Sequence, residues 1–412
     1  MKIWKRVMGA LVVSLVVCVV CPVQVTATNI NGRASTVFEW FDDPDENTAT
    51  PIYQYLHFNA TDIGDSGWNF RGYGRLADDL SDEVDVDSRL YFAYIEKRDL
   101  VDDLDFKLGR QFLSTVAGAI LMDGLHLEYS GLGPVEIELF GGGDVSYYEG
   151  YNAEDLVFGV EIASNKLLKN LEVGLSYMQK WEDSDLSHEL IGFDMEYDVP
   201  RLIQFYNETQ YSWITDEVTY FLLGSKYYRS PNWSLTAEYL YSLPIFSANS
   251  IYSVFSVDEY EEASLEFLYT FSRDLRAFLR YQREFYESVS DADVFEAGIE
   301  KIRSDRFSGY LIGTYRLDDD GQDLAGVKAR IAYRCTSNIE TGIGAHVDVF
   351  ERQIGFLGDQ YNDDDETTSQ RYWVDLTANI TKSINLQAKL ESVKSDLWDE
   401  YYRGRLRLNI LF

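Results

Sequence analysis

The sequence predicts an all-β chain that closes into a transmembrane antiparallel up-and-down β-barrel. Three observations lead to this fold class. Apolar and polar residues alternate with a period of two along most of the chain. The composition combines 8 Trp, 30 Tyr and 23 Phe with a slightly negative mean hydropathy of −0.24. Only 7 prolines interrupt the 412 residues. Because only every second residue of a barrel strand has to face lipid, such a chain need not be hydrophobic on average.

The N-terminal segment Met1–Ala27 has the pattern of a secretory signal peptide. Three basic residues precede an apolar run over 7–20, and small residues surround Ala27. A membrane-spanning helix needs about 20 apolar residues, and this run is shorter. We expect cleavage after Ala27 and a single barrel domain over 28–412. A lipoprotein leader using Cys18 or Cys21 is the alternative, but valine precedes each of these cysteines.

Charge and cysteine content exclude several classes of protein. The formal net charge of −33 excludes a nucleic-acid binder on electrostatic grounds. The many aromatic residues exclude a disordered acidic chain. After removal of the leader only Cys335 remains, so no intramolecular disulfide and no cysteine-based metal or haem motif is possible. We therefore expect no cofactor.

Alternating segments separated by Asp, Asn, Gly and Ser clusters recur from about Ile52 to the end of the chain. No helical period of comparable length competes with them. The clearer predicted strands are 68–76, 171–178, 263–271, 275–281, 307–315, 325–333, 339–349, 372–380, 384–390 and 403–412. Counting every candidate gives 16 to 22 strands, and an even number near 18 is our preferred value.

The last ten residues alternate most clearly and end on Phe412. Successive side chains of a strand point to opposite faces. One face therefore suits lipid and the other suits water, with members Leu406, Leu408, Ile410 and Phe412 against Arg403, Arg405, Arg407 and Asn409. This ending resembles the C-terminal strand of Gram-negative outer-membrane barrels. The resemblance implies an outer-membrane location, surrounding lipid and lipopolysaccharide, and recognition by the barrel-assembly machinery through the strand that ends at Phe412.

Connections between the predicted strands differ in length. Short turns such as 272–274 contrast with acidic connections such as 317–323 and 353–368. In outer-membrane barrels short turns face the periplasm and long loops face outside. We nevertheless expect the short turn Thr381–Ser383 on the outer side. The acidic runs 318–320 and 363–366 lack the spacing of a calcium-binding loop, so we interpret them as solvated loops that attract cations diffusely.

A second local pattern is more specific. Asp105–Gln111 contains Gly109-Arg110-Gln111 and is followed by a stretch of small residues and then by Met122–Tyr129. This arrangement resembles porins, including alginate-export-type channels, and it supports the porin class. Arg110 and Gln111 offer hydrogen-bond donors beside the segment Phe112–Met122, where an inward fold would define the constriction. Arg110 and Gln111 then become candidate pore-lining residues. Pairing of Arg110 with a carboxylate of the barrel wall is the structural alternative.

A wide barrel leaves an aqueous passage, so the sequence predicts a porin-like channel for small hydrophilic solutes. Strand parity places a basic strip inside the C-terminal half, which favours anionic solutes. Its predicted members are Arg276, Arg280, Lys328, Arg330, Arg334, Arg371, Lys389, Arg403, Arg405 and Arg407. Pairing of these groups with inward-folded acidic loops is the alternative interpretation.

Two other functions remain as alternatives. One is a barrel sheath around a periplasmic cytochrome in an electron conduit, and the other is a barrel hydrolase using His346 and Asp348. A His–Asp pair at this spacing arises readily from strand alternation, so we favour a structural role for both residues and expect no enzymatic activity. Either a homotrimer or a monomer is compatible with the predicted strand number.

Overall fold

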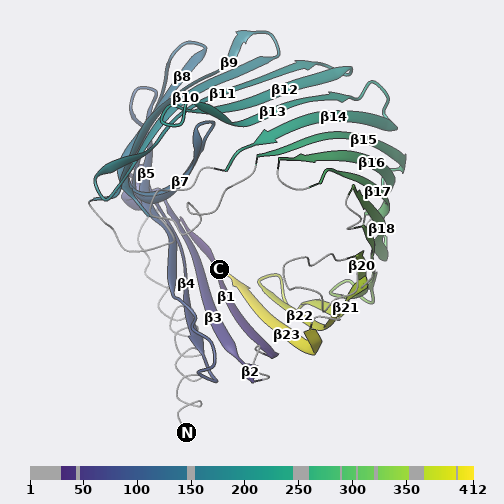
Figure 1. Ribbon diagram of the computed structural model, residues 1–412. Coiled ribbons are helices and arrows are strands. Elements are labelled where there is room, and N and C mark those ends of the chain that lie inside the picture. Colours follow the sequence, from purple (N-terminus) through teal and green to yellow (C-terminus); the bar gives the residue numbers. More distant parts are fainter. Residues whose placement is uncertain are drawn as a thin grey trace.

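The computed structural model describes residues 29–42, 47–145, 154–244, 259–287, 290–302, 305–319, 323–351, 366–395 and 398–412. These residues form one antiparallel sheet that closes on itself (Figure 1). Strand β1 (Asn29–Asp42) pairs with β3 (Pro51–Thr61) on one side and with the last strand, β23 (Trp398–Leu411), on the other. The predicted fold class is therefore confirmed. The leader Met1–Ala27 lies outside the described residues.

The ring contains 22 long strands among the described residues. The two-residue β2 (Thr48–Ala49) pairs only with the end of β1. The count reaches the upper limit of the predicted range and exceeds the preferred value near 18. The strands not yet named are β4 Trp68–Asp79, β5 Arg89–Val101, β6 Leu104–Thr115, β7 Gly118–Leu132, β8 Val135–Asp144, β9 Leu156–Leu168, β10 Leu171–Glu182, β11 Asp185–Val199, β12 Ile203–Ser212, β13 Glu217–Tyr227, β14 Trp233–Ser242, β15 Tyr260–Ser272, β16 Leu275–Tyr286, β17 Ala292–Lys301, β18 Phe307–Asp318, β19 Leu324–Arg334, β20 Ile339–Glu351, β21 Glu366–Asn379 and β22 Ile384–Ser395.

Helical structure is minor in the described part of the chain. A single 3-10 turn, η1 (Ile63–Asp65), connects β3 to β4. No helix among the described residues is long and apolar enough to span a bilayer.

The two rims of the barrel differ in their connections. At the rim that holds the C-terminus the strands are joined by tight turns, in which Asp103, Gly133 and Asn170 adopt positive φ. The connections 80–88, 145–155, 243–259 and 352–365 at the other rim are longer. Because β23 runs toward the C-terminus and β22 is antiparallel to it, the turn Thr381–Ser383 lies at the tight-turn rim. Our prediction that this turn lies at the long-loop rim is wrong.

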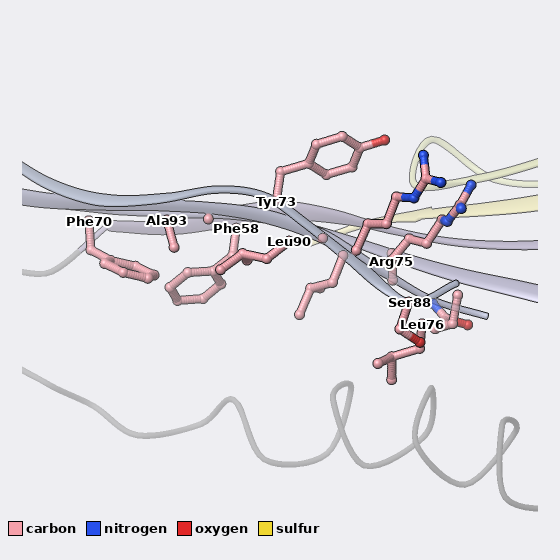
Figure 2. A pocket seen from close by; sticks show the side chains of 14 residues that line it. Phe58, Phe70, Tyr73, Arg75, Leu76, Ser88, Leu90 and Ala93 are labelled. Atoms are coloured by element: carbon pink, nitrogen blue, oxygen red, sulfur yellow. The ribbon is translucent and has the colours of Figure 1, made fainter. Parts of the chain in front are cut away.

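Each strand presents an apolar face and a polar face. Large apolar side chains stay exposed on the outer face, for example Leu279 (60%), Ile331 (60%) and Ile343 (62%). Figure 2 shows the separation on β3 to β5, where Phe58, Phe70, Leu76 and Leu90 point away from Tyr73 and Arg75. The apolar side chains there surround a shallow depression of about 540 Å³ over Gly72 and Gly74.

The number of strands determines the width of the interior. With a strand spacing of about 4.8 Å and a tilt of about 40°, a ring of this size has a backbone diameter of roughly 40 Å. Side chains of ordinary length leave an interior roughly 30 Å across. Wall side chains alone therefore cannot fill this barrel.

Candidate functional site: an inward hairpin and two charged walls

The ends of β6 and β7 nearest the long-loop rim leave the barrel wall as a hairpin. The β5–β6 pairing ends at Ala93–Arg110, and the β7–β8 pairing begins at Met122–Asp144. Beyond these points β6 and β7 pair with each other as far as Thr115 and Gly118, and one further backbone hydrogen bond joins Val145 N–H to the Leu121 carbonyl oxygen. We call residues 111–121 the inward hairpin, because its tip contacts the inner face of β10 to β12 (Figure 1).

Glycines at the base of the hairpin permit the bend. Gly109 has φ +128°, and a Cβ at this position would lie 2.3 Å from the Ala93 carbonyl oxygen. A Cβ on Gly124 would lie 2.7 Å from the Cα of Gly142 on the next strand. A side chain at either position would separate the strands where they must approach most closely.

The tip of the hairpin docks on the wall through both polar and apolar contacts. The Ala117 N–H donates to Ser176 Oγ at 2.6 Å, and Gln210 Nε2 donates to the Ala117 carbonyl oxygen at 2.6 Å. Gly192 lies directly beneath the tip, where a Cβ would be 2.3 Å from Ala117 N. An apolar cluster surrounds these contacts and consists of Ala117, Ile120, Met122, Phe140, Val157, Met178 and Leu190.

Because the hairpin folds inward, the face that alternation assigns to the passage is buried against the wall, and the face assigned to lipid is exposed to the interior. Gln111 faces the wall, is 2% exposed and donates from Nε2 to the Gly124 carbonyl oxygen at 3.0 Å. Arg110 and Phe112 lie on the opposite face, where Phe112 is 62% exposed. Arg110 forms a two-point ion pair with Asp123, with N···O distances of 2.8 and 2.7 Å. Of the two candidate pore-lining residues here, Gln111 is therefore an anchor of the hairpin, which differs from our prediction.

The carboxylate partner of Arg110 comes from β7 at the base of the hairpin, where Asp123 still pairs with Gly143 of β8 in the barrel wall. This is the pairing with a wall carboxylate that the structural alternative expected. Strand parity alone places Arg110 and Asp123 on the outer, apolar face. A charged pair at positions that alternation assigns to the lipid-facing side, next to Gly109 and Gly124, is the sequence signal for this bend. We did not use this signal in our predictions from the sequence.

The predicted basic residues of the C-terminal half all lie on one face of the sheet. This is the inner face of the barrel, the same face that the tip of the hairpin contacts on β10 to β12. Several pair with carboxylates there. Arg330 contacts Asp375 at 2.6 and 3.0 Å, and Arg403 contacts Glu391 at 2.7 Å. Further pairs are Arg276–Glu300 at 2.6 Å, Arg280–Glu296 at 3.3 Å, Arg280–Glu266, Lys389–Glu391 at 2.8 Å and Arg405–Glu39 at 3.2 Å.

The other predicted basic residues lack such a carboxylate contact among the described residues. Arg407 Nε donates to Asn409 Oδ1 at 3.0 Å, and Lys328 Nζ lies 5.8 Å from the ring centre of Tyr310. Arg371 is opposite His346 in the ladder, and Arg334 is opposite Glu340 near the tight-turn rim. The strip is thus partly neutralised by carboxylates on neighbouring strands, whereas the alternative interpretation expected inward-folded acidic loops as the partners.

An acidic wall that we did not predict covers the opposite part of the inner face. Its members are Glu128, Glu136, Glu138, Glu161, Glu172, Asp194, Glu196, Glu208 and Glu238. Ladder pairs such as Glu172–Glu196 and Asp194–Glu208 place these carboxylates on the face that carries Ser176, Gly192 and Gln210. Strand parity applied to β7 to β14 would have found this wall.

One part of the acidic wall has a donor set that a hard divalent cation prefers. Carboxylate oxygens of Glu128, Glu136 and Glu138 lie within 4.8 Å of one another. His126, which is 2% exposed, contacts Glu138 through Nε2 at 2.9 Å. This contact ties Glu138 to the neighbouring strand.

His346 and Asp348 form the pair expected from their spacing. Their Nε2 and Oδ2 atoms are 3.0 Å apart. Lys328 and Arg371 are the ladder neighbours of His346, so its cross-strand surroundings are cationic. This arrangement agrees with the structural role that we favour for both residues.

Comparisons with known proteins found similar structures. No family model matches the sequence, and no curated protein matches it. Crystal structures of OpdQ from Pseudomonas aeruginosa and OccAB3 from Acinetobacter baumannii each align at 10% identity and a TM-score of 0.49, covering 94% of this chain and 99% of theirs. OccK2 (OpdF) from P. aeruginosa aligns at 10% identity and a TM-score of 0.48, covering 94% of this chain and 98% of its own. The barrel assignment rests on the closed strand ladder of the chain itself.

Proposed function

We propose that this protein is an outer-membrane channel through which small hydrophilic solutes diffuse. The observation that carries this proposal is the closed ring of 22 strands with an apolar outer face and a charged inner face. An apolar exterior suits acyl chains, and a charged interior of this width suits water. The signal-peptide pattern of Met1–Ala27 agrees with export of the chain to that membrane.

The inward hairpin narrows the passage in this proposal. It covers part of one wall and presents Phe112 to the open side, with the Arg110–Asp123 pair at its base. Its docking contacts keep it in one position, so the size limit for solutes is a fixed property of the barrel. Arg110 is therefore retained as a pore-lining residue.

The basic strip gives the channel a path for anions. The pore-lining basic residues in this proposal are Arg276, Arg280, Lys328, Arg330, Arg334, Arg371, Lys389, Arg403, Arg405 and Arg407. Because surface charge raises the local concentration of counter-ions, anions are enriched along this wall. Replacing Arg403, Arg405 and Arg407 by glutamine should lower the permeability for chloride relative to potassium, measured as the reversal potential in a salt gradient. An unchanged reversal potential would refute the anion path.

Conductance of the purified, detergent-extracted protein in planar bilayers tests the channel itself. Discrete, ohmic single-channel currents are expected. Negligible conductance together with co-purification of a multihaem protein would favour the cytochrome sheath. The proposal also includes assembly by the barrel machinery, which heat-modifiable migration measures. The number of copies in the native particle is measured from its native mass.

A further inference from the structure

We infer that the barrel contains a second, cation-selective path along its acidic wall, separate from the anion path along the basic wall. This inference rests on the proposed channel function. It concerns which solutes pass and where they pass. The charges of the inner face, their pairing and the width of the interior carry the argument.

The basic wall is broader than the predicted strip. Its predicted members lie on β16, on β19 and on β21 to β23, and it continues across the closure of the barrel onto β1, β3 and β4. The ladder puts Tyr55 opposite Ser35 and Arg75 opposite Tyr55, and Ser35 donates to Asn409 on the inner face of β23. Arg75 is thus on the inner face, and Figure 2 shows it on the side opposite the apolar residues. Arg71 shares this face and pairs with Glu96 at 2.8 Å.

The acidic wall differs from the basic wall because its carboxylates on β10 to β14 have no cationic partner among the described residues. Among the described residues Glu172, Asp194, Glu196, Glu208 and Glu238 form no ion pair with lysine or arginine. Where they have side-chain partners, these are neutral: Gln204 Nε2 donates to Glu196 at 2.6 Å, and the Tyr206 hydroxyl donates to Glu238. A neutral donor leaves the negative charge in place. The part of the wall on β10 to β14 therefore attracts cations.

The acidic residues form a continuous track below the docked hairpin. Ser176, Gly192 and Gln210 hold the tip at mid-height of β10, β11 and β12. Glu172, Asp194, Glu196 and Glu208 lie between these contacts and the tight-turn rim. A cation that passes the hairpin thus meets the track immediately.

The acidic track on β10 to β12 lies across the barrel from the part of the basic wall on β22, β23 and β1. In the closed ring, β12 and β13 are the strands farthest from the seam between β23 and β1, and β11 is next to them (Figure 1). The interior is roughly 30 Å across. The screening length at physiological salt is about 8 Å, so the field of one wall is largely screened at the other. The walls therefore act independently, and a small solute responds only to the wall that it follows.

Two sets of substitutions separate these paths. The first set, Glu172→Gln, Asp194→Asn and Glu208→Gln, neutralises the acidic wall. The second set, Arg403→Gln, Arg405→Gln and Arg407→Gln, neutralises part of the basic wall. Glu189→Gln is the matched control, because Glu189 lies on β11 with Asp194 but on the outer face, where it accepts from the Tyr177 hydroxyl at 2.5 Å.

The experiment measures the ratio of potassium to chloride permeability from reversal potentials, and the total conductance of the same reconstituted single channels from current–voltage slopes, at about 0.1 M and about 1 M KCl. Together the ratio and the conductance give the two permeabilities. The acidic-wall set should lower potassium permeability roughly threefold, the enrichment produced by a potential of about one kT, and leave chloride unchanged. The basic-wall set should lower chloride alone, and the combined variant should show both losses independently. Both effects should shrink at the higher salt concentration.

Other results would overturn the inference. Conducting channels whose potassium permeability is unchanged by the acidic-wall set, or falls equally with Glu189→Gln, would refute the cation path alone. Coupled losses in the combined variant would refute independence of the two walls. Absence of current in the wild-type channel would refute the proposed function and this inference together. Heat-modifiable migration of each variant confirms that the barrel has formed before any current is interpreted.

Discussion

Substitution of Gly192 should release the inward hairpin. A Cβ at this position would lie 2.3 Å from Ala117 N and 2.3 Å from the Val116 carbonyl carbon, and both of these are backbone atoms. Gly192→Ala already requires the tip to move. Gly192→Val adds methyl groups that cannot be accommodated without undocking.

The contacts that hold the hairpin tip on the wall determine the free energy of docking. Two hydrogen bonds to Ala117 contribute about 1 kcal/mol each. Burial of Ile120, which is 5% exposed, adds about 2 kcal/mol, and burial of Ala117 adds roughly 1 kcal/mol. Docking is therefore worth on the order of 5 kcal/mol, which keeps the undocked fraction below about one in a thousand. Gly192→Val should remove most of this preference.

Thiol accessibility measures the undocked state directly. Ile120→Cys is placed in a Cys335→Ser background, because Cys335 is exposed. Its reaction with a charged, membrane-impermeant thiol reagent should be slow with Gly192 and at least a hundredfold faster with Gly192→Val. Single-channel conductance should rise by roughly a tenth. The reason is that the undocked hairpin, which is about 10 Å wide and about 10 Å thick, no longer occupies part of the cross-section of the passage.

Gly313→Ala is the control, because the nearest neighbouring atom to a Cβ there lies 4.0 Å away. It should change neither the labelling rate nor the conductance. A correctly assembled Gly192→Val barrel with wild-type labelling and wild-type conductance would refute the docked hairpin.

Two further predictions concern stability and assembly. Arg110→Ala and Asp123→Ala should each lower the free energy of unfolding by about 2 kcal/mol, because the side chains are only 10% and 23% exposed and removal of either leaves the other unpaired. The double variant should cost little more than one single variant, so additive losses in a urea double-mutant cycle would contradict the pairing. Deletion of Phe412 should reduce the heat-modifiable fraction of newly made protein, because the Phe412 backbone exchanges hydrogen bonds of 2.9 and 3.2 Å with Gly32 across the seam. Phe412→Tyr keeps the backbone and an aromatic ring and should assemble normally, whereas equal assembly of the deletion would argue against the role of the seam.

Local alternation predicted the barrel wall because the physical requirement is local. A strand between lipid and water must separate its side chains by parity, and Leu406 to Phe412 show this separation without reference to any other strand. The same rule placed Arg330 and Arg403 on the inner face. It was insufficient for the strand count, because connections as short as Asp183–Ser184 separate strands whose limits the alternation does not mark.

At the inward hairpin, strand parity no longer predicts which side chains face the passage. Arg110 and Gln111 are adjacent, so on one straight strand they face opposite sides, and parity assigns Arg110 to the outer face and Gln111 to the passage. The bend at Gly109 and Gly124 reverses this assignment, because it turns the outer face of the hairpin toward the interior. Neither the docking partners Ser176 and Gln210 nor the pairing of Arg110 with Asp123 follows from spacing along the chain.

By itself the sequence determined the fold class and the face on which most charged residues lie, since both follow from a side-chain period of two. Only the tertiary structure decided the ring of 22 strands, the hairpin inside it and the placement of the acidic track across from the basic wall on β22, β23 and β1. These features depend on closure of the ring. Closure brings β1 beside β23 and sets β12 opposite both, through hydrogen bonds between residues hundreds of positions apart.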